Sequence, residues 1–359
     1  MKKLYIIIAS IVIFLSLVSG ALLIFYKSSL GAVSKVSDEV EFEVMDNQTY
    51  STLGKSLYQK GLIKSELIYK IYIKLNNPGN LQKGIYKLNK NMNLDKIVNT
   101  LSKGSTYNPN LITVTFKEGW NVRKIATTIS ENTNNTYEDV INQINDKTYI
   151  NELINEYWFL TNEILDSRIY YPLEGYLFPE TYQIDKTYSV KEILKIMLDH
   201  TDKILSEHKS SIEASSYSIH QMMTLASIVE LEAGNSDDRK GVAGVFYNRL
   251  QAGWSMGSDV TTYYASKIDD FKYSLTYKEL DDCSSGYNTR CKSFIGLPVG
   301  PISNPSKESI IASIEPTKHD YYYFVADKNG KTYFNETDSG HIKTVNKLKS
   351  EGLWIEYQN

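Results

Sequence analysis

The chain has 359 residues and a formal net charge of −3, because 39 Lys and Arg oppose 42 Asp and Glu. Without a basic excess to neutralise phosphates, nucleic acid is not an expected partner. Hydrophobic residues at 42% and charged residues at 23% are typical of a folded globular chain, and the two cysteines and five histidines lack ligand spacing, so we expect neither a metal site nor a cofactor.

The N-terminal region holds one long apolar stretch, residues 4–26, in which no side chain is charged. As a helix this stretch extends about 35 Å, enough to cross a hydrocarbon layer of about 30 Å. A cleaved signal peptide is the alternative, but its apolar core is only about 7 to 15 residues long. Lys2 and Lys3 precede the stretch and only Lys27 follows closely. We therefore expect residues 1–26 to form a cytoplasmic tip and a single membrane-spanning helix, with the rest of the chain outside.

Two further segments are expected before the larger domain. Residues 27–40 are small, polar and mixed in charge, which predicts a linker. In residues 41–107, strand-like runs at 40–45 and 84–88 bracket helical patterns over 53–62, 67–75 and 94–101. This small α+β module resembles the LysM fold, which grips glycan chains. A packing module without a ligand is the alternative.

Residues 108–359 are predicted to form a larger α+β domain. A strand over 111–116 precedes a helix near Asn121, and the polar residues 132–149 are expected at the surface. The stretch 171–182 is dense in aromatic residues and prolines, which suits either a sugar-stacking wall or a buried loop.

The segment 220–233 carries the strongest chemical signal. Its apolar residues recur at helical spacing, which predicts a helix central to the domain. Glu230 and Glu232 lie about 200° apart on that helix, so only one of them easily faces a given cleft. Aliphatic neighbours raise the pKa of a carboxyl group and keep its proton available, as a general acid requires. Two solvated residues near a helix end, with Gly234 as the stop, are the alternative.

The remainder of the chain supplies further candidate elements. A second helix begins near residues 237–240 and ends near Asn248 and Arg249. Residues 259–263 alternate as a strand would, and Gly and Pro make 296–305 a rigid loop. Residues 321–325 and 332–334 predict a hairpin that completes a sheet. Cys283 and Cys291 either form a disulfide or remain free thiols.

Several ordered motifs together resemble the endolytic murein transglycosylase family (MltG, YceG-like). They comprise residues 83–86, 118–119, 174–182, 225–232, 245–250, 258–259, 287–289, 296–298 with Gly300, and 323–327. The resemblance covers nearly everything after the apolar stretch. Gly257, Val260 and Val299 depart from the residues usual in the family.

The resemblance implies a bacterial enzyme anchored in the cytoplasmic membrane, with its catalytic domain outside. Such an enzyme is a non-hydrolytic lyase that cleaves the MurNAc-β-1,4-GlcNAc bond within nascent peptidoglycan strands. It leaves 1,6-anhydroMurNAc ends and thereby terminates strand elongation. Its implied partners are glycan strands, the membrane through residues 4–26, and the peptidoglycan synthases of the wall-elongation machinery.

The resemblance also assigns roles to residues. The family's catalytic acid is the second Glu of a Glu-x-Glu pair, which is Glu232 here. The candidates for substrate binding are Glu230, Asn248, Arg249, Asp259, Tyr287, Asn288, Gly296, Leu297 and Pro298. Two alternatives stay open: a glycan-binding scaffold without catalysis, and a muramidase that pairs Glu232 with a second carboxylate from Glu230 or Asp259.

Overall fold

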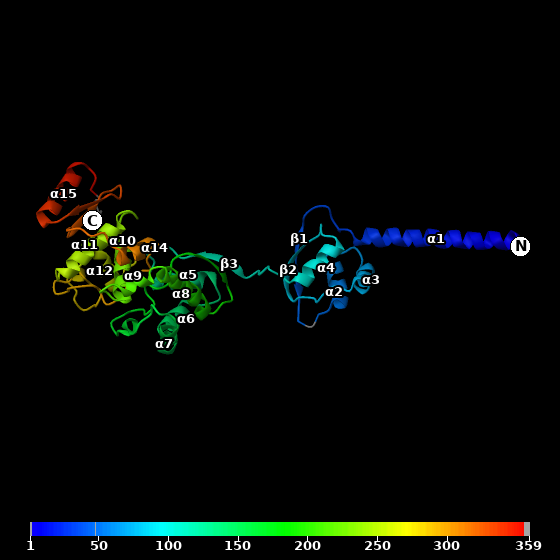
Figure 1. Ribbon diagram of the computed structural model, residues 1–359, viewed down its shortest axis with the longest axis horizontal. Coiled ribbons are helices and arrows are strands. Elements are labelled where there is room, and N and C mark those ends of the chain that lie inside the picture. The colour runs from blue at the N-terminus through cyan, green and yellow to red at the C-terminus, as the bar shows by residue number, and fades with distance from the viewer. Residues whose placement is uncertain (1, 47, 355–359) are drawn as a thin grey trace. The chain divides into compact units, whose positions relative to one another are not determined.

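The structure is a computed structural model that describes residues 2–46 and 48–354. The segments expected from the sequence include residues 1, 47 and 355–359, which lie outside the described residues. The chain is a mixed α+β protein with two compact units, Met1–Asn110 and Leu111–Asn359 (Figure 1). The sequence places the corresponding boundary after residue 107.

The first unit begins with the helix α1 (Lys2–Leu30), which is long and apolar enough to cross a membrane. The helix extends beyond the uncharged stretch at both ends, so residues 27–30 continue it instead of starting the predicted linker. The physical reason is local packing. Leu30 contacts the core of the first unit, and the Lys64 Nζ donates a hydrogen bond to the Ser28 carbonyl at 3.0 Å.

The rest of the first unit packs three helices with one antiparallel strand pair. Strand β1 (Glu39–Val44) pairs with β2 (Gly84–Asn89), and Phe42 lies opposite Tyr86 in the core. Between the strands come α2 (Tyr50–Gln59) and α3 (Glu66–Asn76), and α4 (Leu94–Lys103) follows β2. Ser65 and Asn93 cap α3 and α4 by accepting hydrogen bonds from backbone N–H groups. These elements lie where the apolar periodicity predicts them.

The second unit opens with a helical layer around one strand pair. Strand β3 (Leu111–Thr115) pairs with β4 (Thr181–Asp185) in antiparallel register. The surrounding helices are α5 (Val122–Asn132), α6 (Tyr137–Ile144), α7 (Lys147–Glu156), the 3₁₀ turn η1 (Asn162–Leu165), α8 (Val190–Ser206) and α9 (Lys209–Glu213).

Two expectations in this region are resolved by burial. The stretch 132–149 is not simply a polar surface segment, because α6 and α7 direct Val140, Ile144 and Tyr149 into the core. The aromatic stretch 171–182 is largely a buried loop, with Leu173 and Tyr176 at 0% and 1% exposure. The buried-loop alternative therefore fits residues 173–177.

The remaining elements surround α10 (Ile219–Glu232), whose residues from Met222 to Val229 are all buried. It packs against α11 (Arg239–Gln251), α12 (Asp259–Ala265) and α14 (Lys307–Ile314). The helix is therefore central to the domain, as its apolar periodicity predicts. A short helix, α13 (Tyr277–Leu280), lies in the connection between α12 and α14.

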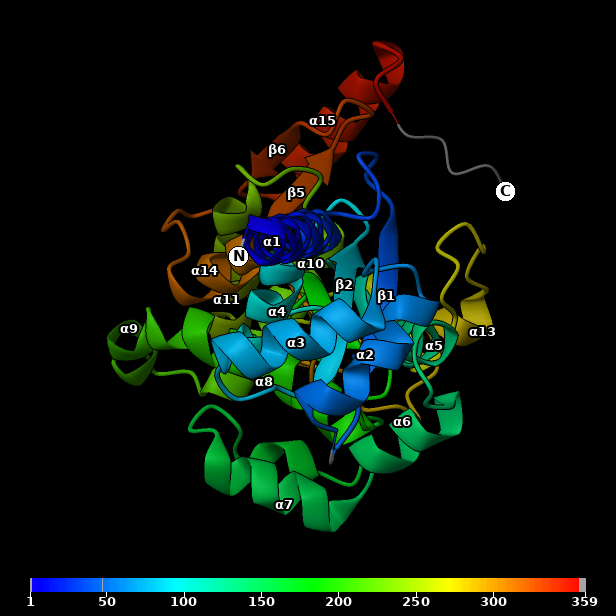
Figure 2. The ribbon, with the colours of Figure 1, turned by 90° about the vertical axis from the view of Figure 1, so that its right-hand side faces the viewer.

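Two local predictions are wrong in this region. Residues 259–263 form the start of α12 rather than a strand, since Thr261 and Thr262 are both buried on adjacent positions of one helical turn. The hairpin β5 (Tyr323–Ala326) and β6 (Thr332–Asn335) exists, but it does not complete a larger sheet. Within the described ranges, each of the three sheets has two strands. The helix α15 (Asp338–Ser350) packs beside both strands of the hairpin (Figure 2).

Candidate active site

Glu230 and Glu232 leave the last turn of α10 toward different partners, as their angular separation predicts. Glu230 is almost fully buried and forms an ion pair with Arg239 at 3.0 Å. Its other carboxylate oxygen accepts hydrogen bonds from the backbone N–H and the hydroxyl of Ser306, at 2.9 and 2.5 Å. Ser306 is the N-cap of α14. The Glu230 carboxylate therefore ties α10 to α14.

Glu232 has a different environment at the C-terminal end of α10. The hydroxyl of Ser258 donates a hydrogen bond to its carboxylate at 2.5 Å. Burial raises the pKa of Glu232 above its ordinary value, and the nearby Asp259 carboxylate raises that pKa further. The Ser258 hydrogen bond and the guanidinium groups of Arg249 and Arg290 act in the opposite direction without cancelling the increase. The result is a carboxyl group that keeps its proton to a higher pH than a solvated glutamic acid.

A pinned loop, residues 255–259, brings Ser258 and Asp259 to this carboxyl group. The backbone N–H of Ser258 donates to the Thr289 hydroxyl at 3.1 Å, and the Ser255 hydroxyl donates to the Thr289 carbonyl. Arg290 forms an ion pair with Asp259, 3.1 Å from Nε to the carboxylate. Residues 289–290 thus hold the loop against the end of α10.

Asn248 and Arg249 connect α11 to the C-terminal hairpin. The side-chain amide of Asn248 donates to the carbonyls of His319 and Tyr321, at 2.7 and 2.8 Å. These bonds make Asn248 a structural clamp rather than a free substrate donor. Arg249 donates to the carbonyls of Tyr322 and Met256, at 2.8 and 2.5 Å, while its charge still acts on Glu232.

Tyr287 and Asn288, two candidates for substrate binding, are both buried. Tyr287 is 0% exposed and packs between the rings of Tyr170 and Tyr264. The Asn288 amide donates to the carbonyls of residues 279, 280 and 282, and its oxygen accepts from the Thr262 hydroxyl at 2.7 Å. A disulfide joins Cys283 to Cys291 around these residues, with 5.3 Å between the two Cα atoms. The segment 283–291 is therefore a fixed loop that supports Thr289 and Arg290.

The loop residues Gly296, Leu297 and Pro298 line a cavity of about 630 Å³. Gly296 adopts a φ of +91°, which suits glycine, and its backbone forms a parallel bridge with that of Ser255. The opposite wall includes Asp166 and Arg168. Because Ser255 starts the pinned loop, this cavity lies next to the segment that carries Ser258.

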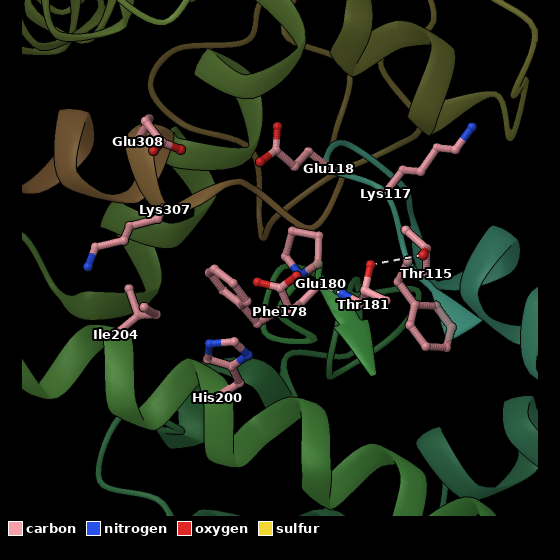
Figure 3. Close-up of a pocket in the computed structure, with 12 residues that line it drawn as sticks. Thr115, Lys117, Glu118, Phe178, Glu180, Thr181, His200, Ile204, Lys307 and Glu308 are labelled. Atoms are coloured by element: carbon pink, nitrogen blue, oxygen red, sulfur yellow. Dashed lines mark hydrogen bonds between the residues drawn. The ribbon is translucent and has the colours of Figure 1, made fainter. Parts of the chain in front are cut away.

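A second cavity of about 630 Å³ lies at the end of the β3–β4 pair (Figure 3). Its lining includes the carboxylates of Glu118, Glu180 and Glu308, and the ring of His200 packs on Phe178 at 4.6 Å. Among the described lining residues of the two cavities, Glu232 does not occur. The carboxyl group at position 232 faces the pinned loop instead.

Comparison with known proteins identifies relatives of this chain. A sequence profile described as the YceG-like family matches residues 42–347. The chain belongs to the YceG-like family. It is 36% identical over 337 residues to an endolytic murein transglycosylase of Bacillus subtilis, covering 93% of this chain and 92% of that protein.

Two further relatives support the same family membership. An endolytic murein transglycosylase of Streptococcus pneumoniae is 31% identical, with 94% of this chain and 64% of that protein covered. The crystal structure of a YceG-like protein from Listeria monocytogenes superposes with a TM-score of 0.61 at 34% identity, over 86% of this chain and 100% of that one.

The structure also reveals residues that the family motifs do not single out. Trp254 is 42% exposed, and its ring packs against those of Tyr322 and Tyr323, with 5.0 and 6.1 Å between the centroids. Arg290 lies between Asp259 and the loop carbonyl of Gly257. A single sequence offers no signal for either role, because both depend on contacts between distant segments.

Proposed function

We propose that this YceG-like protein is an endolytic murein transglycosylase in which Glu232 is the catalytic acid. It cleaves the MurNAc-β-1,4-GlcNAc bond within a peptidoglycan strand and leaves a 1,6-anhydroMurNAc end. The names of the curated relatives support the reaction. The observation that carries the assignment to Glu232 is its environment, since burial at a helix C-terminus raises its pKa and Ser258 fixes its orientation.

In the first step, protonated Glu232 donates its proton to the glycosidic oxygen that leaves the muramic anomeric carbon. Positive charge develops at that carbon, and the acetamido oxygen of the substrate stabilises it. The newly ionised carboxylate accepts the hydrogen bond from Ser258, and Arg249 and Arg290 stabilise its negative charge. No second enzymatic carboxylate is required for this step.

In the second step, the Glu232 carboxylate removes the proton from the muramic 6-hydroxyl. The resulting oxygen attacks the anomeric carbon of the same sugar and closes the anhydro ring. The proton that Glu232 gave to the leaving group is thereby replaced, and water is not consumed. The partly exposed ring of Trp254, which packs on Tyr322 and Tyr323, offers an aromatic surface for a sugar ring.

The test is the conservative substitution Glu232→Gln. Its amide oxygen still accepts the Ser258 hydrogen bond, so the fold is preserved while the transferable proton is lost. We expect anhydro product to fall by roughly 10² to 10⁴-fold, measured by mass spectrometry of muropeptides released from nascent peptidoglycan. Glu308→Gln, an exposed carboxylate of the cavity in Figure 3, is the matched control and should remain active. Undiminished anhydro product from Glu232→Gln removes this residue from the reaction.

One observation favours a second candidate function, a two-carboxylate muramidase. Asp259 is close enough to Glu232 to raise its pKa, whereas Glu230 is occupied by Arg239 and Ser306 on another side of α10. A muramidase adds water and yields reducing ends in place of anhydro ends. The variant Asp259→Asn separates the two, because it abolishes a muramidase but leaves a transglycosylase active. A non-catalytic scaffold would bind glycan strands but would produce neither anhydro ends nor reducing ends.

The first unit is suited to hold the enzyme at the membrane, where glycan strands are made. We propose that α1 anchors the chain once in the cytoplasmic membrane, with the N-terminus inside and the chain after α1 outside, beside the peptidoglycan synthases. The strand–helix–helix–strand order from β1 to β2 supports a LysM-like, glycan-gripping module. An anchored enzyme of this kind acts on strands as they are made and terminates their elongation.

A further inference from the structure

Helix α3 carries an apolar stripe on its exposed side. Leu67, Ile71 and Leu75 are 65%, 38% and 70% exposed. Their spacing of four residues places them in one line along the helix. The opposite face of the same helix is buried in the core through Ile68, Tyr69 and Tyr72. A continuous exposed stripe of large aliphatic side chains indicates a surface that contacts a membrane or another protein.

Basic side chains accompany the stripe. Residues 64–76 contain three lysines, at positions 64, 70 and 74, and one acidic residue, Glu66, so the segment has a net charge of 3 − 1 = +2. Lys70 forms an ion pair with Glu66 at 2.6 Å, which leaves Lys74 as an exposed cation one helical turn further along. Lysine side chains on an amphipathic helix reach the headgroups of anionic lipids while the apolar face inserts.

The position of α3 in the first unit decides between the two kinds of contact. The Lys64 Nζ, just before α3, donates to the Ser28 carbonyl near the end of α1, and α3 itself contacts α1. Tyr26 is the last residue of the uncharged stretch. Figures 1 and 2 show α3 beside this end of α1. The helix is therefore level with the point where the apolar span ends.

We propose that α3 lies on the surface of the bilayer that α1 crosses, with Leu67, Ile71 and Leu75 inserted among the lipid headgroups and its lysines facing anionic phospholipids. This inference rests on the proposed membrane anchor. Its consequence is that the first unit is held against the membrane at two places, the end of α1 and the exposed side of α3. The unit then keeps a fixed orientation instead of turning freely on the end of a single helix.

Photo-crosslinking of the full chain in vesicles tests the contact. p-Benzoylphenylalanine is introduced at Ile71, at Asn99 on the exposed side of α4 as the matched position, and at Leu15 within α1 as the anchor control. The vesicles contain phosphatidylcholine with or without phosphatidylglycerol, and adducts are identified by mass spectrometry. We expect about fivefold more lipid adduct at position 71 than at 99, and a lower yield at 71 after Lys70→Glu with Lys74→Glu in phosphatidylglycerol vesicles.

The controls make each outcome decisive. Lys96→Glu, an exposed charge reversal on α4, should leave the adducts at position 71 unchanged. Lipid adducts at Leu15 but no more at Ile71 than at Asn99 overturn the inference and leave the anchor in place. Adducts at Ile71 to protein instead of lipid overturn it in favour of a partner helix. Without lipid adducts at Leu15, the anchor fails and the inference fails with it.

Discussion

Two glutamates that are neighbours in sequence acquire opposite chemistry from their surroundings. Glu230 forms an ion pair with Arg239 and accepts two hydrogen bonds from Ser306, so its carboxylate holds α10 against α14. Glu232 instead has burial and Asp259 opposing its ionisation. A proton available for transfer therefore belongs to Glu232, and the groups that tune its pKa are open to substitution.

The pH dependence of catalysis follows from that tuning. The first step needs protonated Glu232, so kcat/KM should fall as the pH rises through its raised pKa. Asp259→Asn removes an anion that raises this pKa, and we expect the decline to begin at lower pH. Arg290→Gln removes a cation that lowers the pKa and also frees the Asp259 carboxylate, so the decline should begin at higher pH. Profiles of kcat/KM against pH that move in the same direction for both variants contradict this assignment.

Glu174 predicts a pH dependence of stability rather than of catalysis. It is 1% exposed, and burial raises its pKa from 4.5 to about 7. Between these two values the unfolded chain releases the proton while the folded chain keeps it. The contribution of Glu174 to the free energy of unfolding should therefore be largest below pH 4.5, fall by roughly 3 kcal/mol as the pH rises to about 7, and change no further above that.

The variant Glu174→Gln isolates this effect because its side chain does not titrate. The native carboxylate receives hydrogen bonds from the Val122 N–H, the Asn304 amide and the Tyr264 hydroxyl. A glutamine amide group facing these donors should destabilise the fold by about 1 to 3 kcal/mol. Urea unfolding between pH 4.5 and 8 should show the slope in the natural chain and its loss in the variant. Parallel curves for the two proteins refute the raised pKa.

At the scale of elements, the sequence predicts what is periodic and local. The helices of the first unit and α10 have apolar residues at a regular helical spacing, so their positions follow from the sequence. Helix α12 is only seven residues long, too short for its period to be distinguished from the alternation of a strand. Tyr287 and Asn288 carry a recognisable motif, but their burial depends on Tyr170 and Thr262, which are distant in sequence. The motif therefore identifies the site without separating supporting residues from those that touch substrate.

The disulfide loop should matter for both stability and catalysis. The bond between Cys283 and Cys291 closes a short loop whose Thr289 holds Ser255 and Ser258. In Cys283→Ser with Cys291→Ser, we expect the free energy of unfolding to fall by about 2 to 3 kcal/mol. The kcat should fall less than in Glu232→Gln, since Asn288 still fixes part of the loop. Unfolding curves and kcat that match those of the oxidised natural chain contradict the supporting role.

At the scale of the whole molecule, the chemistry and its location are encoded in separate units. The proposed catalytic carboxyl group and the residues that tune it all lie in Leu111–Asn359, whereas the apolar helix belongs to Met1–Asn110. The proposed reaction needs neither a metal ion nor a second carboxylate. Glu232 can therefore act on any glycan strand that reaches it. Control over which strands are cut must then come from where the enzyme is held.

The proposed topology is the most direct test of that division. Residues 4–26 of α1 are uncharged, and the most apolar part of this helix is not covered by any other part of the structure. The helix therefore needs a bilayer to cover it. We expect the full chain to stay with the membrane during alkaline carbonate extraction. Protease added to intact spheroplasts should digest the chain after α1 but spare an epitope tag fused before residue 2. A chain recovered from the medium without its apolar stretch would instead identify a signal peptide, and a tag digested in intact spheroplasts would reverse the orientation.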